Sequence, residues 1–243
     1  MNYIIGLHED LSEFIDTGLK DPFLADFARE WSDWRIRSTD PWFSVLIGVC
    51  QQNASFRQGW RMLLNIIKIY GRKIHIEGFG DTYIPPEPSD ILRDPSKLID
   101  AKVGYRAETI KEAAKRFSEK RFVEEILEAK SSEEFERELR EIRGVGPYTA
   151  RLALVLSKRI YERPPIDRWL RRIISEIYKV DLSYAEKKWI EIWGKWSGLA
   201  SMAATIALDA EPLQKALKRI RERKLVPDPS VAPSPANMWL YMK

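Results

Sequence analysis

The stretch EIRGVGPYTARLAL, residues 141–154, sets the architecture of the chain. Helical periodicity stops before its glycines and resumes after them, giving candidate helices at 132–141 and 147–158. Gly144 and Gly146 lack a Cβ atom, so both can take positive φ and let a partner approach the backbone closely. The proline that follows them suits a first-turn position, where a missing N–H costs nothing. The stretch therefore predicts a tight hairpin between two helices.

The start of the second helix is suited to bind an anion. Amides around Gly146, Tyr148 and Thr149 lie at the positive end of the helix dipole, where N–H groups have no helical partner. A phosphodiester fits such a site. The backbone carbonyls of Ile142 and Val145 are candidates to hold a sodium or potassium ion that bridges to the phosphate. The alternative is an ordinary corner between two helices, closed by a glycine cap.

Composition excludes several kinds of site. The chain has 243 residues, of which 44% are apolar, and can bury a stable core without disulfides or structural metals. The single cysteine, Cys50, excludes an internal disulfide and a four-cysteine iron–sulfur cluster, and two histidines are too few for a histidine-rich metal site. We therefore expect no required cofactor.

Charge gives a weaker indication. The 40 basic and 36 acidic residues leave a net charge of +4, which suits a polyanionic partner about as well as a solvated, ion-paired surface. No apolar run approaches the ~20 residues of a membrane span, and the first residues lack a signal-peptide pattern. We expect an intracellular protein of the cytoplasm or nucleoid with no membrane partner. A charged fraction of 31% with one cysteine and two histidines suits a thermophilic source, and we expect a prokaryotic one.

Helical periodicity dominates the chain, so we predict an all-α fold with little or no sheet. The irregular stretch at 70–92 is rich in glycine and proline, and it holds either a short strand hairpin or a plain connection. Candidate helices lie at 8–17, 21–35, 41–55, 56–71, 88–93, 96–101, 105–118, 121–129, 132–141, 147–158, 168–178, 183–193, 197–208 and 211–224.

We divide the chain into four segments. Residues 1–40 are N-terminal helices that pack with the C-terminal lobe, and residues 41–140 form a helical lobe. Residues 141–225 form a lobe with the hairpin and the helices after it. Residues 226–243 contain four prolines, and we expect this tail to be extended and to dock on the body.

The hairpin resembles a motif of a known family. LREIRGVGPYTARLAL (139–154), followed by Ile166 and Asp167, is similar to the helix-hairpin-helix and downstream aspartate of the base-excision DNA glycosylases of the HhH-GPD superfamily. TDPWFSVLIGVCQQNASFRQGW (39–60) and KVGYRAETIKEAA (102–114) resemble the two wedge segments of that family.

The likeness extends over about residues 20–210, since WSGLASMAATIAL (196–208) resembles the late helix that closes the active-site cleft. It implies a two-lobed helical enzyme with a cleft between the lobes, which flips a damaged base out of duplex DNA and removes it. DPWF and GYRA are most like the 8-oxoguanine glycosylase branch, whereas QQ and GVGPYTA sit closer to the alkylpurine (3-methyladenine) branch. Oxidised guanine and alkylated adenine are therefore the candidate lesions.

Asp167 is the predicted catalytic residue. Cleavage of an N-glycosidic bond builds oxocarbenium character on the sugar, and a nearby carboxylate stabilises that charge and can orient or deprotonate water. Asp167 precedes the helix predicted at 168–178, a position that favours the ionised form. The alternative is a helix N-cap with no catalytic role.

Tyr148 stands where lyase members of the family carry a nucleophilic lysine. A phenol cannot form an imine, so the resemblance implies a glycosylase that uses water and has no lyase step. Lys158 or Lys102 could replace that lysine only if the fold brings one of them to the cleft. Tyr148 and Trp42 are the predicted walls of the base pocket, with plain core packing as the alternative.

A glycosylase must also fill the space that the flipped base leaves. Asn53 and Gln52 follow the first wedge helix, and Tyr105 matches the residue that wedges beside the partner base. The alternatives are capping of the next helix by Gln52 and Asn53, and burial of Tyr105. The residues predicted to bind phosphate are Gly144, Val145, Gly146, Thr149, Arg143 and Arg106.

Two other interpretations of the whole protein stay open. One is a bifunctional 8-oxoguanine glycosylase and lyase with a relocated lysine. The other is a non-catalytic protein that uses the hairpin only to bind DNA of a particular structure. For the hydrolytic glycosylase, we expect a monomer whose partner is double-stranded DNA that contains a damaged base.

Overall fold

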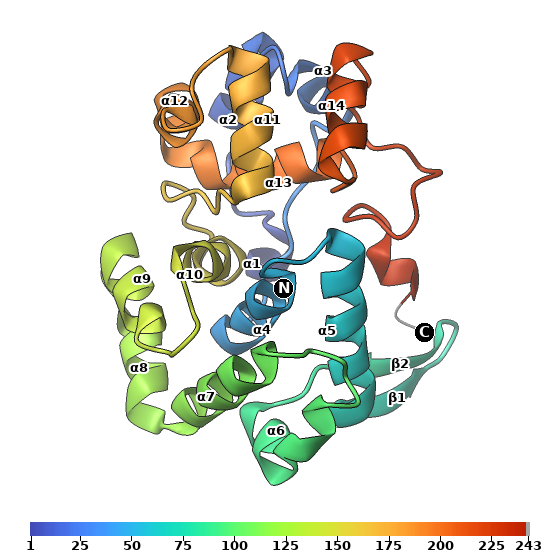
Figure 1. Ribbon diagram of the computed structural model, residues 1–243, viewed down its shortest axis with the longest axis vertical. Coiled ribbons are helices and arrows are strands. Elements are labelled where there is room, and N and C mark those ends of the chain that lie inside the picture. The colour runs from blue at the N-terminus through green and yellow to red at the C-terminus, as the bar shows by residue number, and fades with distance from the viewer. Residues whose placement is uncertain (242–243) are drawn as a thin grey trace. The chain divides into compact units, whose positions relative to one another are not determined.

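Helices dominate the computed structural model, which describes residues 1–241 apart from the side chain of Trp239. The described residues contain one two-stranded sheet, so the predicted helical fold with little sheet is confirmed. The chain divides into two compact units, whose elements are labelled in Figure 1. Unit 1 comprises Met1–Thr39 and Leu154–Ala236, and unit 2 comprises Asp40–Ala153 and, of the described tail, residues 237–241.

This division differs from the segments drawn from the sequence. The predicted segment 141–225 kept the hairpin and Asp167 together, whereas the hairpin belongs to unit 2 and Asp167 to unit 1. The reason is that the helix after the hairpin packs against the first helix of unit 2, which holds residues 141–153 in that unit. Residues 1–39 share unit 1 with the C-terminal part of the chain.

Unit 1 has a core around α13 (Ser197–Ala207), most of which is buried because its small side chains let neighbouring segments approach. Trp189 packs there with no exposed surface, and its Nε1 donates to the Ser197 carbonyl at 2.9 Å. The other elements of unit 1 are α1 (Asn2–Ile5), α2 (Ser12–Lys20), α3 (Ala25–Glu30), the π-helical turn η2 (Leu154–Lys158), α11 (Arg168–Tyr178), α12 (Ala185–Trp193), the 3-10 turn η3 (Gly194–Trp196) and α14 (Leu213–Arg221).

Unit 2 has α4 (Pro41–Gln51) at its core, with mostly apolar residues that contact α5, α7 and α10. Asp40 caps this helix by accepting the Phe43 amide at 2.9 Å, and the proline after it occupies the first turn. The other helices of unit 2 are α5 (Phe56–Tyr70), α6 (Pro88–Arg93), the 3-10 turn η1 (Pro95–Leu98), α7 (Arg106–Ser118), α8 (Lys120–Glu128), α9 (Ser132–Arg140), α10 (Pro147–Ala153) and the 3-10 turn η4 (Met238–Tyr241).

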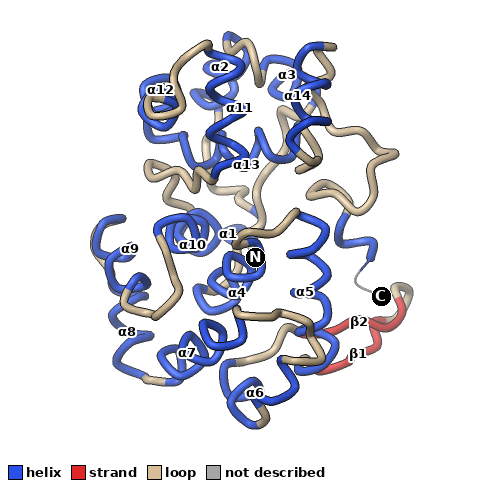
Figure 2. Tube along the Cα trace, viewed as in Figure 1, coloured by secondary structure: helices blue, strands red, loops and turns tan. Residues whose placement is uncertain are grey.

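The irregular stretch at 70–92 forms the short strand hairpin that was one of its two predicted forms. Strands β1 (Arg72–Ile76) and β2 (Gly80–Ile84) pair antiparallel and lie beside α5, as Figure 2 shows in red. Residues 226–237 of the tail form neither helix nor strand, and the 3-10 turn that follows belongs to unit 2 and leaves Leu240 and Tyr241 about half exposed.

Candidate nucleic-acid interface and catalytic carboxylate

The Gly-Val-Gly hairpin joins two helices as predicted, with α9 ending at Arg140 and α10 beginning at Pro147. Ile142 and Val145 are buried and anchor the loop in unit 2. The Val145 amide donates to the Ile142 carbonyl at 3.0 Å. Because its side chain is buried and its amide is used within the loop, Val145 anchors the hairpin and offers no donor to phosphate, which corrects its predicted role.

The two glycines serve different purposes. Gly144 has a φ of +91°, and a Cβ atom there would lie 2.0 Å from the Thr109 hydroxyl of α7, so only glycine fits. Gly146 does not use the positive φ that glycine allows, and apart from Gly146 itself and its two chain neighbours no atom of the described chain lies within 4 Å of the place its Cβ would take. The fold therefore does not require a glycine at position 146, and the space beside it is open to a partner.

The other residues predicted to bind phosphate differ in their exposure to solvent. Arg143 is exposed beside the hairpin, as a phosphate ligand should be. The Thr149 side chain is fully buried, and its hydroxyl accepts a hydrogen bond from Gln52, so only its backbone is suited to meet an anion. Thr149 lies in the first turn of α10, where the helix dipole places its positive end.

The predicted wedge residues Asn53 and Tyr105 are in contact. They are 52 positions apart, and Asn53 Nδ2 donates to the Tyr105 hydroxyl at 3.1 Å. Asn53 is exposed and has a φ of +46°, and Tyr105 is 63% exposed. Burial, the alternative interpretation of Tyr105, is therefore wrong. The pair presents a ring and an amide to solvent, which suits insertion into a base stack.

Arg106 does not have the exposure that its predicted phosphate contact needs. It is 8% exposed, and its guanidinium donates to the backbone carbonyls of Gln52 and Val103. The same guanidinium lies 4.6 Å from the centre of the Tyr105 ring. Arg106 thus holds the wedge loops through buried contacts, which corrects its predicted role as a phosphate ligand.

Gln52 is directed toward the hairpin, and its predicted wedge role is corrected. Its Nε2 donates to the Gly144 carbonyl and to the Thr149 hydroxyl, each at 2.9 Å. The cap of α5 comes instead from Ser55, which forms a capping box with Gln58. The wedge assignment therefore rests on Asn53 and Tyr105.

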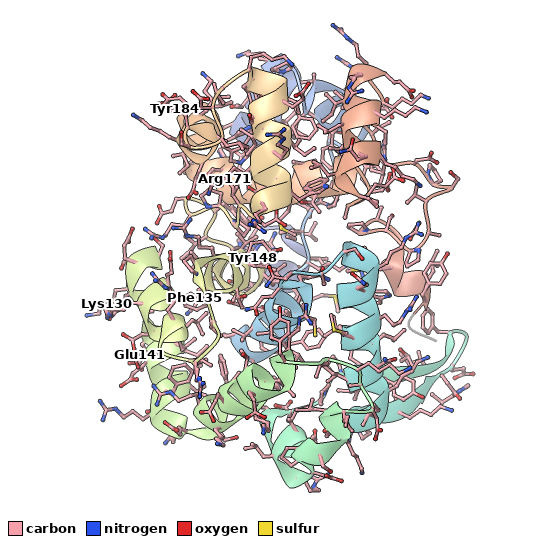
Figure 3. The ribbon with its side chains drawn as sticks, viewed as in Figure 1. Lys130, Phe135, Glu141, Tyr148, Arg171 and Tyr184 are labelled. Carbon is pink, nitrogen blue, oxygen red and sulfur yellow. The ribbon has the colours of Figure 1, made fainter. Side chains whose placement is uncertain are left out.

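The two predicted base-pocket residues have different surroundings. Tyr148 is half-buried on the first turn of α10, where Figure 3 labels it. Trp42 is 5% exposed, its Nε1 donates to the Pro86 carbonyl at 2.8 Å, and it packs against Phe117. These contacts place the Trp42 indole in the core of unit 2, so the structure does not support its predicted role in a base pocket.

Asp167 is the N-cap of α11 in unit 1, and its carboxylate accepts the Leu170 amide at 2.8 Å. The side chain reaches solvent, yet desolvation by the surrounding protein raises the pKa of Asp167 above its ordinary value. Hydrogen bonds from the Leu170 and Trp169 amides oppose this shift. The amides at the helix start favour the ionised form, as expected from the sequence, but desolvation outweighs them and the net shift of the pKa is upward. A raised pKa is typical of carboxylates that exchange protons.

The two lysines considered as replacements for a nucleophile lie in different units. Lys158 ends η2 in unit 1, and burial lowers the pKa of its ammonium. Lys102 is exposed in unit 2, shortly before the second wedge loop, with a φ of +57°.

The carbonyls suggested for a monovalent cation are hard oxygen donors, as such an ion requires. The Ile142 carbonyl already accepts the Val145 amide, which leaves it one lone pair for an ion. In the part of the chain that the structure describes, no cluster of three or more histidine, cysteine or acidic side chains is arranged to hold a metal. No helix of that part has the length and hydropathy needed to cross a membrane.

The fold is that of the helix-hairpin-helix DNA glycosylases. The 8-oxoguanine glycosylase/lyase of Clostridium acetobutylicum, solved with double-stranded DNA containing cytosine opposite 8-oxoguanine, superposes with a TM-score of 0.73 at 22% identity over 91% of this chain and 73% of its own. The 3-methyladenine DNA glycosylase of Archaeoglobus fulgidus superposes with a TM-score of 0.69 at 21% identity over 93% of this chain and 74% of its own.

A sequence relative points to the same group. The DNA-3-methyladenine glycosylase of Bacillus subtilis is 26% identical over 163 residues, which are 66% of this chain and 54% of that protein. The chain thus matches about half the length of this curated relative. No protein-family model matches the sequence. Similar proteins come from both the 8-oxoguanine and the 3-methyladenine branches, which confirms the mixed resemblance of the motifs.

Proposed function

We propose that the protein is a DNA N-glycosylase, which extrudes a damaged base from duplex DNA and hydrolyses its glycosidic bond to leave an abasic site. The observation that carries the proposal is the contact between Asn53 and Tyr105, two exposed side chains from distant segments of the unit that also holds the hairpin. An exposed ring held by its own hydrogen bond adds little to folding, and it suits a base stack.

Each DNA contact in this proposal has a separate role. Gly146, Arg143 and the first-turn amides of α10 hold a phosphate of the damaged strand. Asn53 and Tyr105 fill the vacated position in the stack. Tyr148, half-buried beside the hairpin, stacks on the extruded base.

The chemical step falls to Asp167. As a carboxylate it stabilises the positive charge that develops on the sugar while the bond to the base breaks, and it orients and deprotonates the attacking water. The water oxygen bonds to C1′, the base leaves with the bonding electrons, and Asp167 takes the proton of the water. Tyr148 supplies no amine, so no imine forms with the sugar and the strand stays intact.

The candidate substrates are an oxidised guanine and an alkylated adenine. Relatives named for 8-oxoguanine and for 3-methyladenine support a damaged purine as the substrate class. Such a protein works on the genome as a monomer inside the cell, with no required cofactor. We also propose that a sodium or potassium ion bound to the carbonyls of Ile142 and Val145 strengthens the phosphate site.

A panel of duplexes with one lesion each tests the hydrolytic proposal. We expect excision of one or more damaged purines, seen as strand cleavage after alkali and no cleavage without it. Borohydride should trap no covalent adduct, since no lysine attacks the sugar. An adduct would support the alternative bifunctional enzyme, for which Lys158 and its lowered pKa make the best nucleophile, and adduct loss in Lys158→Gln would identify it. Binding of damaged duplex without excision of any lesion would support the non-catalytic alternative.

The pH dependence of excision is a second expected result. Because desolvation raises the pKa of Asp167, the single-turnover rate should fall as the pH drops through that raised pKa, earlier than for an ordinary aspartate. Folding stability has the opposite pH dependence to the excision rate. The stability that a neutral Asp167 contributes is present at low pH and is lost as the pH rises through the folded pKa of Asp167. Single-turnover rates between about pH 4 and pH 8 measure this. A rate that stays constant down to about pH 4 would contradict the role of Asp167 as base.

A further inference from the structure

Three segments of unit 2 meet around two side chains that the proposed DNA contacts do not use. They are the loop after α4, the turn before α7, and the hairpin between α9 and α10. Gln52 joins the first to the third, because its Nε2 donates to the Gly144 carbonyl and the Thr149 hydroxyl at 2.9 Å each. Arg106 joins the second to the first, because its guanidinium donates to the Gln52 carbonyl.

The wedge pair lies at one end of this set of contacts. Asn53 directly follows Gln52, and Tyr105 directly precedes Arg106, whose guanidinium also lies against the Tyr105 ring. A shift of either wedge residue must therefore disturb Gln52 or Arg106. The hairpin lies at the other end, where the buried Thr149 fixes the acceptor for Gln52.

The burial of Arg106 argues that this arrangement has a role. Arg106 is 8% exposed, the acceptors of its guanidinium in the described chain are backbone carbonyls, and its Nε has no hydrogen-bond partner among the described residues. A buried cation with neutral partners and one orphan donor is costly, and a methionine would fill the same volume more cheaply. Such a group is consistent with fixing the two wedge loops at a set spacing.

We propose that Gln52 and Arg106 form a brace that holds the wedge pair Asn53–Tyr105 at a fixed position relative to the phosphate-binding hairpin. Both are positioning residues, and the inference rests on the proposed function of the site. When the hairpin binds a phosphate, the brace keeps the wedge aligned with the base stack, so phosphate binding leads directly to insertion. Without the brace, the hairpin still binds DNA but the wedge enters the stack slowly.

The test uses a duplex with a tetrahydrofuran abasic analogue and a neighbouring 2-aminopurine, whose fluorescence rises when the stack opens. Anisotropy of the same duplex gives the affinity. For Gln52→Met, which keeps the length and removes the donor, we expect the rate of the fluorescence rise to fall about tenfold while Kd changes less than about threefold. Thr149→Val should have a similar but smaller effect, and Thr149→Ser, which keeps the hydroxyl, should retain more of the wild-type rate than Thr149→Val. Gln214→Met on the exposed face of α14 is the matched control and should change neither quantity.

The inference is overturned if Gln52→Met and Thr149→Val give wild-type fluorescence kinetics. It is equally overturned if Kd and the fluorescence rate weaken in parallel, since that result describes a hairpin that has lost its structure. If Gln52→Met does not fold, the comparison of Thr149→Val with Thr149→Ser decides alone. Failure of the wild-type protein to bind or open any duplex would instead overturn the proposed function, and the inference with it.

Discussion

Replacing Asp167 with asparagine is expected to slow base excision by about a thousandfold, within the range found when a catalytic acid or base is removed. The amide has no charge to stabilise the oxocarbenium-like sugar and cannot accept a proton from water. Single-turnover excision of the lesion found with the duplex panel measures the loss. Affinity for the same duplex should change little, because the proposed phosphate and wedge contacts belong to unit 2.

The fold should survive this substitution. Asparagine caps helices about as well as aspartate, and its side-chain oxygen can still accept the Leu170 amide. Asp40→Asn is the matched control, since Asp40 caps α4 through the Phe43 amide and has no part in the proposed chemistry. Its excision rate should stay within about twofold of wild type. A folded Asp167→Asn protein with full activity would show that Asp167 is only a cap.

The two glycines of the hairpin should give opposite results when each is replaced with alanine. Gly144→Ala is expected to lower the free energy of unfolding by about 2–3 kcal/mol, from a left-handed backbone and a clash with Thr109. In a protein of this size the melting temperature should drop by about 5–10 °C. Thermal melting without DNA measures the effect.

Gly146→Ala should melt within about 2 °C of wild type, since its Cβ meets open space in the described chain. Its affinity for duplex DNA should fall about tenfold, because the added methyl group stands where a phosphate approaches the backbone. Equal affinities for Gly146→Ala and wild type would mean that phosphate does not bind there. A stable Gly144→Ala protein would mean that the Thr109 contact is not constraining.

The local features of the site could be predicted from the sequence. Pro147 and the two glycines set the helix boundaries of the hairpin, and the position of Asp167 before an apolar-periodic stretch indicated an N-cap. The wedge positions came from a motif resemblance, and the contact of Asn53 with Tyr105 agrees with them. Short-range sequence carries such features because caps and turns are set by a few neighbouring residues.

The features that depend on tertiary packing could not be predicted. Nothing in GYRA shows that Arg106 turns inward under Tyr105, and nothing in QQN shows that Gln52 reaches the hairpin 92 residues later. The sequence does not indicate that Thr109 forces position 144 to be glycine, because a half-exposed threonine on a helix is ordinary. An aromatic side chain such as Trp42 suits a base pocket, but only the tertiary packing shows that Trp42 is buried in the core.

Direct detection of the released base tests the central claim most closely. Purified protein is incubated with a duplex carrying 8-oxoguanine and, separately, with DNA treated with a methylating agent, and small molecules are analysed by mass spectrometry. We expect a free damaged purine from at least one substrate, an intact strand before alkali, and loss of the product in Asp167→Asn. Absence of any free base from both substrates, or a base released at the wild-type rate by Asp167→Asn, would contradict hydrolysis by Asp167.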